Sequence, residues 1–357
     1  MFRPMIKFEH RPVRHGEDWI QIGGAVRGVG SRIHDPGGWV WALLEALDGT
    51  RTVGQVVADL VRRFPTLLAT DVQEAVNDLR AGGYLQEVEA PVQDGRYERG
   101  LVLWRWMDRT PGRSAWDVQL LLAQARVTVV GVGGVGCTAA LDLVLSGVGH
   151  VHCVDHDVVE LSNLNRQILY TERDVGCPKV EVAVRRLREH NSDVQVTGEQ
   201  SRVDAPTMLR RLATECDVLV MAADTPTAIH SWTSEVCQET GTAWVHGGYD
   251  GPQVTVGFYQ PHTGPCHDCG QTARLREVAA GPPLTFWSPG TSRSKAHAAN
   301  AVTAGVSGNY VAHAVMSLIT GVPAIPANGE FGWNLVRLQE SQRVALDSPG
   351  PDCPTCG

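Results

Sequence analysis

VTVVGVGGVGCTAALDLVLSGVGHVHCVDHDVVELSNLNRQILYTERDVGCPK, from Val127 to Lys179, is the stretch that decides the fold of the larger part of the chain. Its apolar start, Val127–Val130, is typical of a buried parallel strand, and a glycine-rich turn and an apolar helix follow. Such a unit forms a phosphate site, because backbone N–H groups and the helix dipole face the anion. We therefore expect four glycines to cradle nucleotide phosphates: Gly131, Gly133, Gly134 and Gly136.

A second apolar strand, Val151–Val154, ends at Asp155, where a carboxylate is placed to bind the hydroxyls of a nucleotide ribose. Polar and basic residues follow it, with Asn163 and Arg166 in SNLNRQ and Lys179 in VGCPK. Cations are needed where charge builds on a transferring phosphoryl group, whereas a nicotinamide enzyme has little use for them there. The pattern therefore favours ATP over a dinucleotide cofactor.

This box resembles that of the adenylyltransferases of the ubiquitin-activating superfamily, the ThiF and MoeB type. The resemblance runs from roughly Arg96 to the C-terminus. It implies that the chain binds ATP and Mg²⁺ and that a substrate carboxylate attacks the bound ATP. It also implies that Asp155 binds the ribose and that Asn163, Arg166 and Lys179 hold the phosphates. A carboxylate is already ionised near neutral pH, so this chemistry requires no general base.

Two more residues receive roles from the resemblance. Asp224 follows the apolar strand Val218–Ala222 and matches the family aspartate that holds magnesium. An N-cap of the next helix is the structural alternative for Asp224, and the two roles are compatible. Arg99, in RYERG, matches the arginine that reaches the neighbouring subunit's ATP site, which implies a homodimer. Gly100 stands where the family usually has glutamine, so an exposed arginine at a helix start is the alternative.

Four of the nine cysteines form two C-x-x-C pairs, in GPCHDCG and PDCPTCG. Each pair can place two thiolates on one turn, and two pairs complete a tetrahedral Zn²⁺ site. The family commonly has a structural zinc in these places. Two unrelated surface pairs, or a redox C-x-x-C, are the alternatives, and His267 is interpreted as a bystander. The expected metal ligands are Cys266, Cys269, Cys353 and Cys356.

The other cysteines are not expected to form a covalent relay. Cys137 begins the helix after the glycine loop, where a helix N-terminus lowers a thiol pKa, but a small packed residue is the preferred interpretation. Thioester-forming relatives use a cysteine in the segment after the first zinc pair, and Thr272–Ala299 has none. We interpret that segment as a mobile crossover loop. The product is expected to leave as an acyl-adenylate or to react directly.

Residues 1–90 differ from the rest of the chain in their pattern of predicted strands and helices. Short alternating strands precede three amphipathic helices and a returning strand, which predicts a small winged-helix-like α+β domain. The segment resembles the PqqD-type domains that recognise ribosomal precursor peptides, on Ile33–Gly38, Leu47–Thr52 and Asp71–Val72. The resemblance implies a leader peptide bound as an extra strand. A purely structural appendage is the alternative, and DNA binding is not expected because Thr70–Ala81 holds only one arginine.

Composition bounds the function further. A chain of 357 residues with 43% hydrophobic residues has room for two or three domains, and we place them at 1–90 and 91–357. A net charge of −8 argues against nucleic acid as a partner. We find no membrane-spanning run and no signal-peptide pattern, and the many thiols are typical of a reducing cytoplasm.

The predicted fold class is therefore α/β, a Rossmann-like doubly wound sheet with structural zinc, preceded by the winged-helix-like domain. Three functions compete. The first is ATP-dependent adenylation of a carboxylate on a ribosomally made precursor peptide, guided by its leader, as in the microcin-C-type adenylyltransferases. The second is adenylation of the C-terminal glycine of a sulfur-carrier protein. The third is a non-catalytic partner that presents a peptide to a cyclodehydratase. A separate downstream modifying enzyme is an expected partner in the first case.

Overall fold

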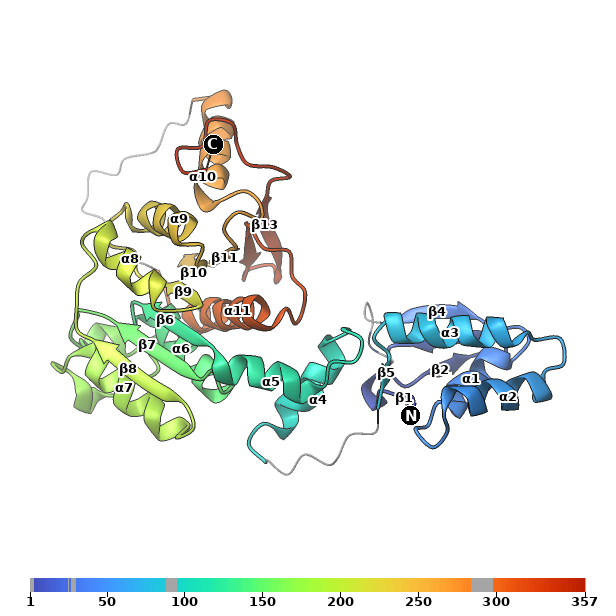
Figure 1. Ribbon diagram of the computed structural model, residues 1–357. Coiled ribbons are helices and arrows are strands. Elements are labelled where there is room, and N and C mark those ends of the chain that lie inside the picture. The colour runs from blue at the N-terminus through green and yellow to red at the C-terminus, as the bar shows by residue number, and fades with distance from the viewer. Residues whose placement is uncertain (1–2, 25, 27–29, 88–94, 284–297, 357) are drawn as a thin grey trace. The chain divides into compact units, whose positions relative to one another are not determined.

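The computed structural model of the protein describes residues 3–24, 26, 30–87, 95–283 and 298–356. The chain forms two compact units, Met1–Leu120 and Leu121–Gly357. Each unit is described by itself (Figure 1). The first unit includes helix α4 (Glu98–Met107), which the sequence analysis assigned to the second domain.

The N-terminal unit combines two small antiparallel sheets with helices. Strands β2, β3 and β4 form one sheet in that order, and β1 pairs with β5 in the other. Strand β1 is short, because the chain turns into a 3-10 helix in which the His10 N–H donates to Lys7 O. The elements before α4 are β1 (Met5–Ile6), η1 (Phe8–His10), β2 (Val13–His15), β3 (Trp19–Ile22), β4 (Ser31–His34), α1 (Trp39–Ala46), α2 (Val53–Arg63), α3 (Ala69–Ala81) and β5 (Leu85–Gln86).

Local signals place the helices of this unit. The Asp35 carboxylate accepts the backbone N–H groups of Val40 and Trp41 and so caps the start of α1. Thr52 and Gln55 form a capping box at the start of α2. The three helices bury one apolar stripe each, and a core of its own forms in this unit around Leu43, Val56 and Val72, all fully buried.

The C-terminal unit is built on one eight-stranded sheet in the order β13-β12-β11-β10-β9-β6-β7-β8. The strands from β10 to β8 are parallel, and β11, β12 and β13 extend the sheet in antiparallel fashion. Its strands are β6 (Arg126–Val130), β7 (His150–Val154), β8 (Gln195–Glu199), β9 (Val218–Met221), β10 (Ala243–Asp250), β11 (Gln253–Tyr259), β12 (Gly329–Asn334) and β13 (Gln339–Ala345).

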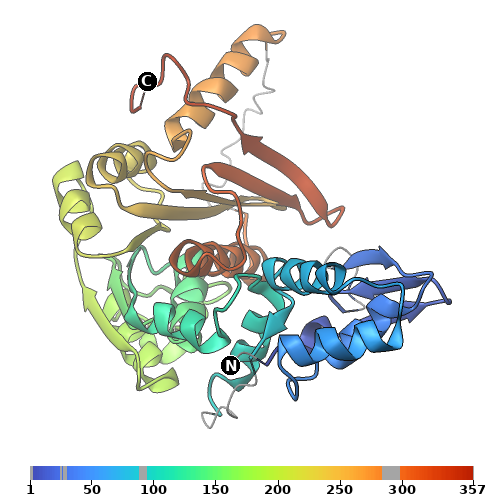
Figure 2. The same cartoon turned by 45° about the vertical axis from the view of Figure 1, so that its right-hand side comes forward.

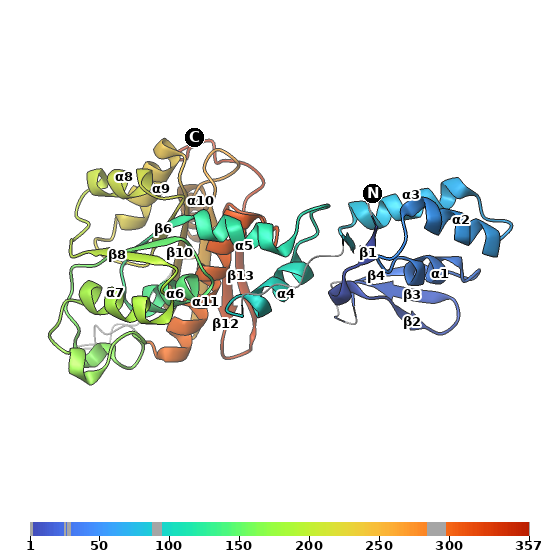
Figure 3. The same cartoon turned by 60° about the horizontal axis from the view of Figure 1, so that its bottom comes forward.

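Helices cover both faces of this sheet, as a doubly wound fold requires. Figures 2 and 3 show α6, α7 and α11 on one face and α8 and α9 on the other. The helices are α5 (Ala115–Gln124), α6 (Gly134–Leu145), α7 (Lys179–His190), α8 (Pro206–Thr214), α9 (Ile229–Thr240), α10 (His267–Ala280) and α11 (Ala301–Thr320), with 3-10 turns η2 (Leu161–Asn163) and η3 (Glu172–Asp174). The mixed α/β sheet with a parallel centre agrees with the predicted Rossmann-like class.

Helix α11 is buried, as its apolar pattern predicts. The Asn300 side chain caps its start by accepting the N–H groups of Val302 and Thr303, and Gly321 ends it in the left-handed region at φ +70°. It packs so closely on β10 that a Cβ at Gly247 would lie 2.5 Å from Val311 Cγ2. Within the described residues, helices that combine the length and the apolar character needed to cross a membrane are absent.

The segment expected to be a crossover loop, Thr272–Ala299, begins differently. Its first residues continue helix α10 to Ala280, so the prediction of a loop is wrong there. Residues 284–297 of that segment lie outside the described residues.

Candidate active site

A cavity of about 280 Å³ opens at the carboxyl ends of the central parallel strands. The chain runs from β6 outward to β7 and β8 and then returns to place β9 on the other side of β6. This reversal leaves a crevice above the strand ends, the place where open α/β sheets bind ligands. The residues that line the cavity include Gly131, Gly133, Asp155, Lys179, Arg202 and Asp224.

At two positions of the loop after β6, the backbone geometry requires glycine. Gly131 has φ +90°, and a Cβ there would lie 2.7 Å from Ala222 O on the neighbouring strand end. A Cβ at Gly136 would lie 1.8 Å from Gly131 O, so only glycine lets helix α6 start this close to the loop. These two positions hold the loop in its sharp turn.

The other two loop glycines have different surroundings. A Cβ at Gly134 would meet Ala304 Cβ of α11 at 2.9 Å, so this glycine permits helix–helix packing. At Gly133, which lines the cavity, the nearest atom to such a Cβ is Gln167 Nε2 at 3.8 Å. A side chain would fit there but would fill space from which a phosphate approaches the backbone. This open position beside a helix N-terminus fits a nucleotide phosphate.

Asp155 lies where the sequence predicts, at the end of β7 and in the cavity wall. It is buried, and its two carboxylate oxygens accept the backbone N–H groups of Val132 and Asp157, both at 2.8 Å. These bonds fix the carboxylate between the glycine loop and the turn after β7. An oxygen acceptor held in this way suits ribose hydroxyl donors.

Lys179 reaches the cavity from the first residue of α7. Its side chain is only 7% exposed, and Nζ lies 3.0 Å from Asp157 Oδ2. The Lys179 N–H also donates to Asp157 O. The ion pair therefore holds one buried cation at the cavity wall, a position suited to an anionic ligand.

The sequence reasoning missed His156 and Asp157, which also line the cavity. His156 Nε2 lies 3.2 Å from Asp157 Oδ1, and one ligand atom each from Asp155, His156 and Asp157 come close enough together to share a metal ion. The signal was the polar run DHD directly after a buried strand. Such a run at the carboxyl end of a parallel strand lies at the ligand-binding edge.

Asp224 is exposed at the cavity, three residues beyond β9. Helix α9 has Ala228, not Asp224, as its N-cap residue, so the alternative interpretation as an N-cap is wrong. A carboxylate is the kind of hard oxygen ligand that Mg²⁺ prefers, so the assignment of Asp224 to Mg²⁺ stays a prediction.

Asn163 and Arg166 are not lining residues of this cavity. The buried Asn163 side chain caps the turn η2, because Oδ1 accepts the Glu160 N–H at 3.0 Å. Arg166 Nη1 donates to Ser162 O and to Asn165 Oδ1, both at 2.9 Å. The Arg166 chain passes beside Gly134, with Cγ 3.4 Å from the Cβ position there. Their assignment to the ATP phosphates stays a prediction.

Arg99 lies in helix α4 of the N-terminal unit and is exposed. Its expected role requires a second subunit, so it also stays a prediction.

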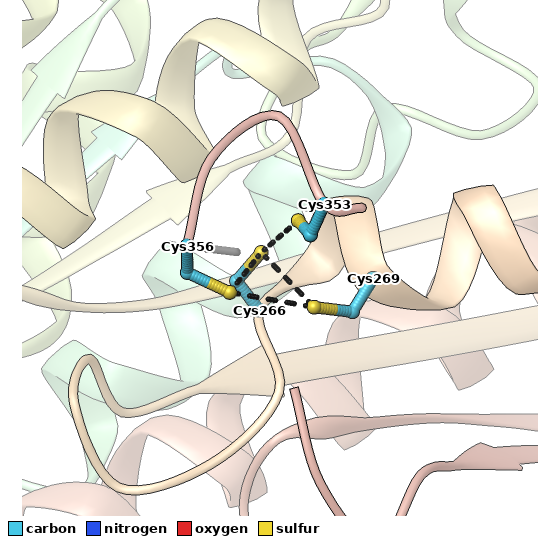
Figure 4. Close-up of side chains that lie close together, drawn as sticks. All are labelled: Cys266, Cys269, Cys353 and Cys356. Carbon is cyan, nitrogen blue, oxygen red and sulfur yellow. Dashed lines mark hydrogen bonds between the residues drawn. The ribbon is translucent and has the colours of Figure 1, made fainter. Parts of the chain in front are cut away.

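The four cysteines of the two C-x-x-C pairs come together, as predicted (Figure 4). Cys266 precedes α10 and Cys269 lies in its first turn, while Cys353 and Cys356 come from the C-terminal tail. The sulfur–sulfur distances are 3.4–3.8 Å, and all four thiols are free of disulfides. A tetrahedral zinc with Zn–S bonds of about 2.3 Å places its sulfurs about 3.8 Å apart. The cluster therefore fits zinc.

The buried His267 is a bystander of this cluster, as expected. Its Nδ1 pairs with Asp268 Oδ1 at 2.9 Å. Asp268 in turn accepts the Ser231 and Thr355 hydroxyls, so the tail is also held by hydrogen bonds beside the sulfurs.

Cys137 is a packed core residue, which confirms the preferred interpretation. It is fully buried, and its Sγ lies 3.1 Å from Val132 O. Burial raises the pKa of the Cys137 thiol to about 12, so the helix N-terminus does not make it a thiolate at neutral pH.

A glycine loop at a topological switch point, followed by a buried acid, a buried lysine and an exposed acid, is typical of a nucleotide-binding enzyme. The chain belongs to the ThiF family, whose model matches residues 109–355.

Curated relatives carry the names of adenylyltransferases, which confirms the predicted class of enzyme. Molybdopterin-synthase adenylyltransferase of Escherichia coli is 30% identical over 73% of this chain and 96% of its own length. Sulfur carrier protein adenylyltransferase of Thermus thermophilus is 34% identical over 66% and 83%. Adenylyltransferase and sulfurtransferase MOCS3 of Arabidopsis thaliana is 32% identical over 60% and 44%. The chain spans about a third to a half of the curated relatives that it matches first.

Solved structures of E. coli MccB share the fold over nearly the whole chain. One superimposes with a TM-score of 0.81 at 20% identity and covers 99% of this chain and 96% of that one. Microcin C7 biosynthetic enzyme MccB in complex with N-formylated MccA gives 0.75 at 21% identity and covers 99% of both. At this identity the likeness concerns the fold alone.

Proposed function

We propose that this protein adenylates a carboxylate of a ribosomally made precursor peptide, using ATP and Mg²⁺, and that its N-terminal unit binds the leader of that peptide. The observation that carries the proposal is the combination of an adenylating site with a separate small domain. Gly133, Asp155, Lys179 and Asp224 meet at one cavity. The likeness to MccB extends over the N-terminal residues as well.

The residues have complementary tasks. Asp155 binds the ribose, the N–H groups of the glycine loop bind phosphates, and Asp224 holds Mg²⁺. Bound ATP offers its α-phosphorus to the substrate carboxylate, so that a new P–O bond forms while the bond to the leaving pyrophosphate breaks. Lys179, oriented by Asp157, stabilises the charge on the departing phosphates, and Arg166 assists when its side chain turns toward them. Catalysis is thus positioning and charge stabilisation.

The leader is proposed to extend the three-stranded sheet. Strand β4 lies at one end of that sheet, and Ser31, Arg32 and His34 are exposed on it. Trp19 of β3 is 47% exposed, and its ring lies 4.7 Å from the His34 ring. An open strand edge beside exposed rings suits an extended peptide, because main-chain bonds give affinity and aromatic contacts give selectivity. This supports the PqqD-like interpretation of residues 1–90.

Adenylation of a sulfur-carrier protein at its C-terminal glycine is the second candidate. The names of the curated relatives favour it, since they act on such carriers or on molybdopterin synthase. A non-catalytic peptide-presenting partner of a cyclodehydratase is the third. A non-catalytic partner would not need an ATP site. The cavity lined by Asp155 and Lys179 therefore argues against this third function.

We further propose a homodimer in which Arg99 of one subunit completes the partner's ATP site, and a zinc ion bound by the four cysteines. A separate modifying enzyme would then consume the adenylated peptide.

Exchange of labelled pyrophosphate into ATP tests the proposed function. The assay compares the protein alone, with the precursor peptide encoded beside it, with the same peptide lacking its leader, and with a sulfur-carrier protein. Exchange that requires the full peptide supports leader-guided adenylation. Exchange with the carrier alone supports the second function, and tight leader binding without any exchange supports the third.

A further inference from the structure

An unusual set of buried charges lies within the N-terminal unit, between the turn η1 and helix α4. Lys7, Glu9 and Asp108 are 3%, 6% and 2% exposed, and His10 is fully buried. Neither the glycine loop nor the sheet edge uses any of them. Charged side chains are almost never buried so completely unless they are paired.

These residues tie the first turn of the chain to the C-terminal half of α4. Arg105 Nη2 and Nε lie 2.9 and 3.0 Å from Glu9 Oε1. His10 Nε2 lies 3.1 Å from Arg105 O, and Lys7 Nζ donates to Asp108 O at 2.7 Å. Partners in η1 and α4 thus meet across about a hundred residues of sequence.

The residues after α4 are held as well. Arg109 donates to Gly82 O and to the Tyr84 hydroxyl, both at 2.9 Å, and its guanidinium lies 4.7 Å above the Tyr84 ring. The Tyr84 hydroxyl lies 3.3 Å from Ser31 Oγ on β4, the strand proposed to receive the leader. A continuous path of polar contacts therefore joins the proposed peptide edge to the end of α4.

Buried ion pairs seldom stabilise a fold more than apolar packing would, because desolvation offsets their attraction. Their attested use is to fix one geometry, and here the fixed object is α4. Arg99 lies on the same helix, less than two turns before Arg105.

We propose that Lys7, Glu9, Arg105 and Asp108 form a clasp that makes α4 part of the peptide-recognition unit and thereby positions Arg99. This inference rests on the proposed function, since it assigns the clasp to a leader-guided reaction. The four are positioning residues, which act through Arg99. The helix that presents Arg99 is then built into the unit that binds the leader.

The test uses the full-length protein with the double substitution Glu9→Gln and Arg105→Met, which removes both charges of the ion pair together. The matched control is Asp59→Asn with Arg62→Met, an exposed ion pair on α2 of the same unit. We measure leader affinity by fluorescence anisotropy, kcat and KM by pyrophosphate exchange, and backbone hydrogen exchange of residues 98–107.

In the clasp variant we expect unchanged leader affinity, a kcat about tenfold lower, and faster hydrogen exchange in α4. In an Arg99→Ala background the clasp substitutions should cause no further loss, because they act through that residue. The control pair should change none of these quantities.

Equal losses of kcat in both backgrounds would overturn the positioning role, and so would unchanged hydrogen exchange in α4. Lost leader affinity would show instead that the clasp only maintains the recognition fold. If the unmodified protein catalyses no pyrophosphate exchange with any substrate offered, the proposed function fails. The hydrogen-exchange comparison still decides whether the clasp holds α4.

Discussion

Gly133 and Gly136 stand three residues apart in one loop, yet alanine should affect them in opposite ways. At Gly136 a Cβ would lie 1.8 Å from Gly131 O, so Gly136→Ala should destabilise the fold by about 3 kcal/mol. At Gly133 the nearest atom is 3.8 Å away, so Gly133→Ala should keep its Tm. It should nevertheless weaken ATP binding roughly tenfold, because the methyl group takes space needed by a phosphate.

Thermal unfolding and ATP titration of the two variants check this expectation. A Gly133→Ala protein that binds ATP normally would show that the loop is not a phosphate cradle. A Gly136→Ala protein with unchanged Tm would contradict the close approach of α6 to the loop.

Residue by residue, the sequence predicts best where the signal is local. Asp155 ends its strand at the cavity as expected, Lys179 lines the same cavity, and the two C-x-x-C pairs come together as predicted. Asn163 and Arg166 are different, since their side chains bond to their own loop. A motif gives the identity of such residues but not their rotamers, which depend on short-range competition for backbone partners.

At the scale of elements, helix α6 contains a carboxylate that opposes folding at neutral pH. Burial raises the pKa of Asp142 to about 6. The folded state therefore binds this proton more tightly than the unfolded chain, whose Asp pKa is about 3.9. The stability contributed by Asp142 is present at low pH and is lost as the pH rises through 6.

Asp142→Asn should consequently raise the free energy of unfolding at about pH 8 by about 1 kcal/mol, after allowance for solvent screening, with a smaller gain at about pH 5. Urea unfolding at both pH values measures the difference. The exposed Asp347→Asn serves as the control. An equal gain at both pH values would show that the effect is not the proton linkage.

The cysteine cluster joins helix α10 to the tail, so it too belongs to the scale of elements. Cys353→Ser removes one thiolate of four and should abolish binding of about one zinc per chain and lower Tm, because bound metal stabilises only the folded tail. Metal analysis by mass spectrometry and thermal unfolding test this. Cys216→Ser, outside the cluster, should retain the metal. Zinc retained in Cys353→Ser would refute the four-thiolate site.

Element boundaries were predictable where capping residues mark them and not where tertiary contacts decide. Asn300 and the Thr52 capping box mark the starts of α11 and α2, and both can be recognised in the sequence. The start of α9 carries no capping side chain, which is why Asp224 was open to interpretation as its N-cap. The continuation of α10 to Ala280 was missed because the glycine, proline and basic residues of the segment lie mostly beyond it.

At the scale of the whole molecule, the sequence pattern predicted a separate N-terminal unit but not the residue at which that unit ends. The contacts of Lys7 and Glu9 with α4 span about a hundred residues and follow no periodic pattern. The sequence therefore suggested a domain boundary between residues 90 and 91, whereas α4 belongs with the first unit. A contact between two single residues that are far apart in the sequence produces no periodic pattern, so it cannot be predicted from the sequence alone.

The proposed sharing of Arg99 between subunits makes the last prediction, which concerns the assembled molecule. Arg99→Ala and Lys179→Ala proteins should each be almost inactive in pyrophosphate exchange. Mixed and allowed to exchange subunits, they should regain about a quarter of wild-type activity, because half of the dimers hold one subunit of each kind and one intact site. That site combines Lys179 of one subunit with Arg99 of the other. No recovery, despite mixed dimers detected by native mass spectrometry, would place Arg99 in its own subunit's site or outside the reaction.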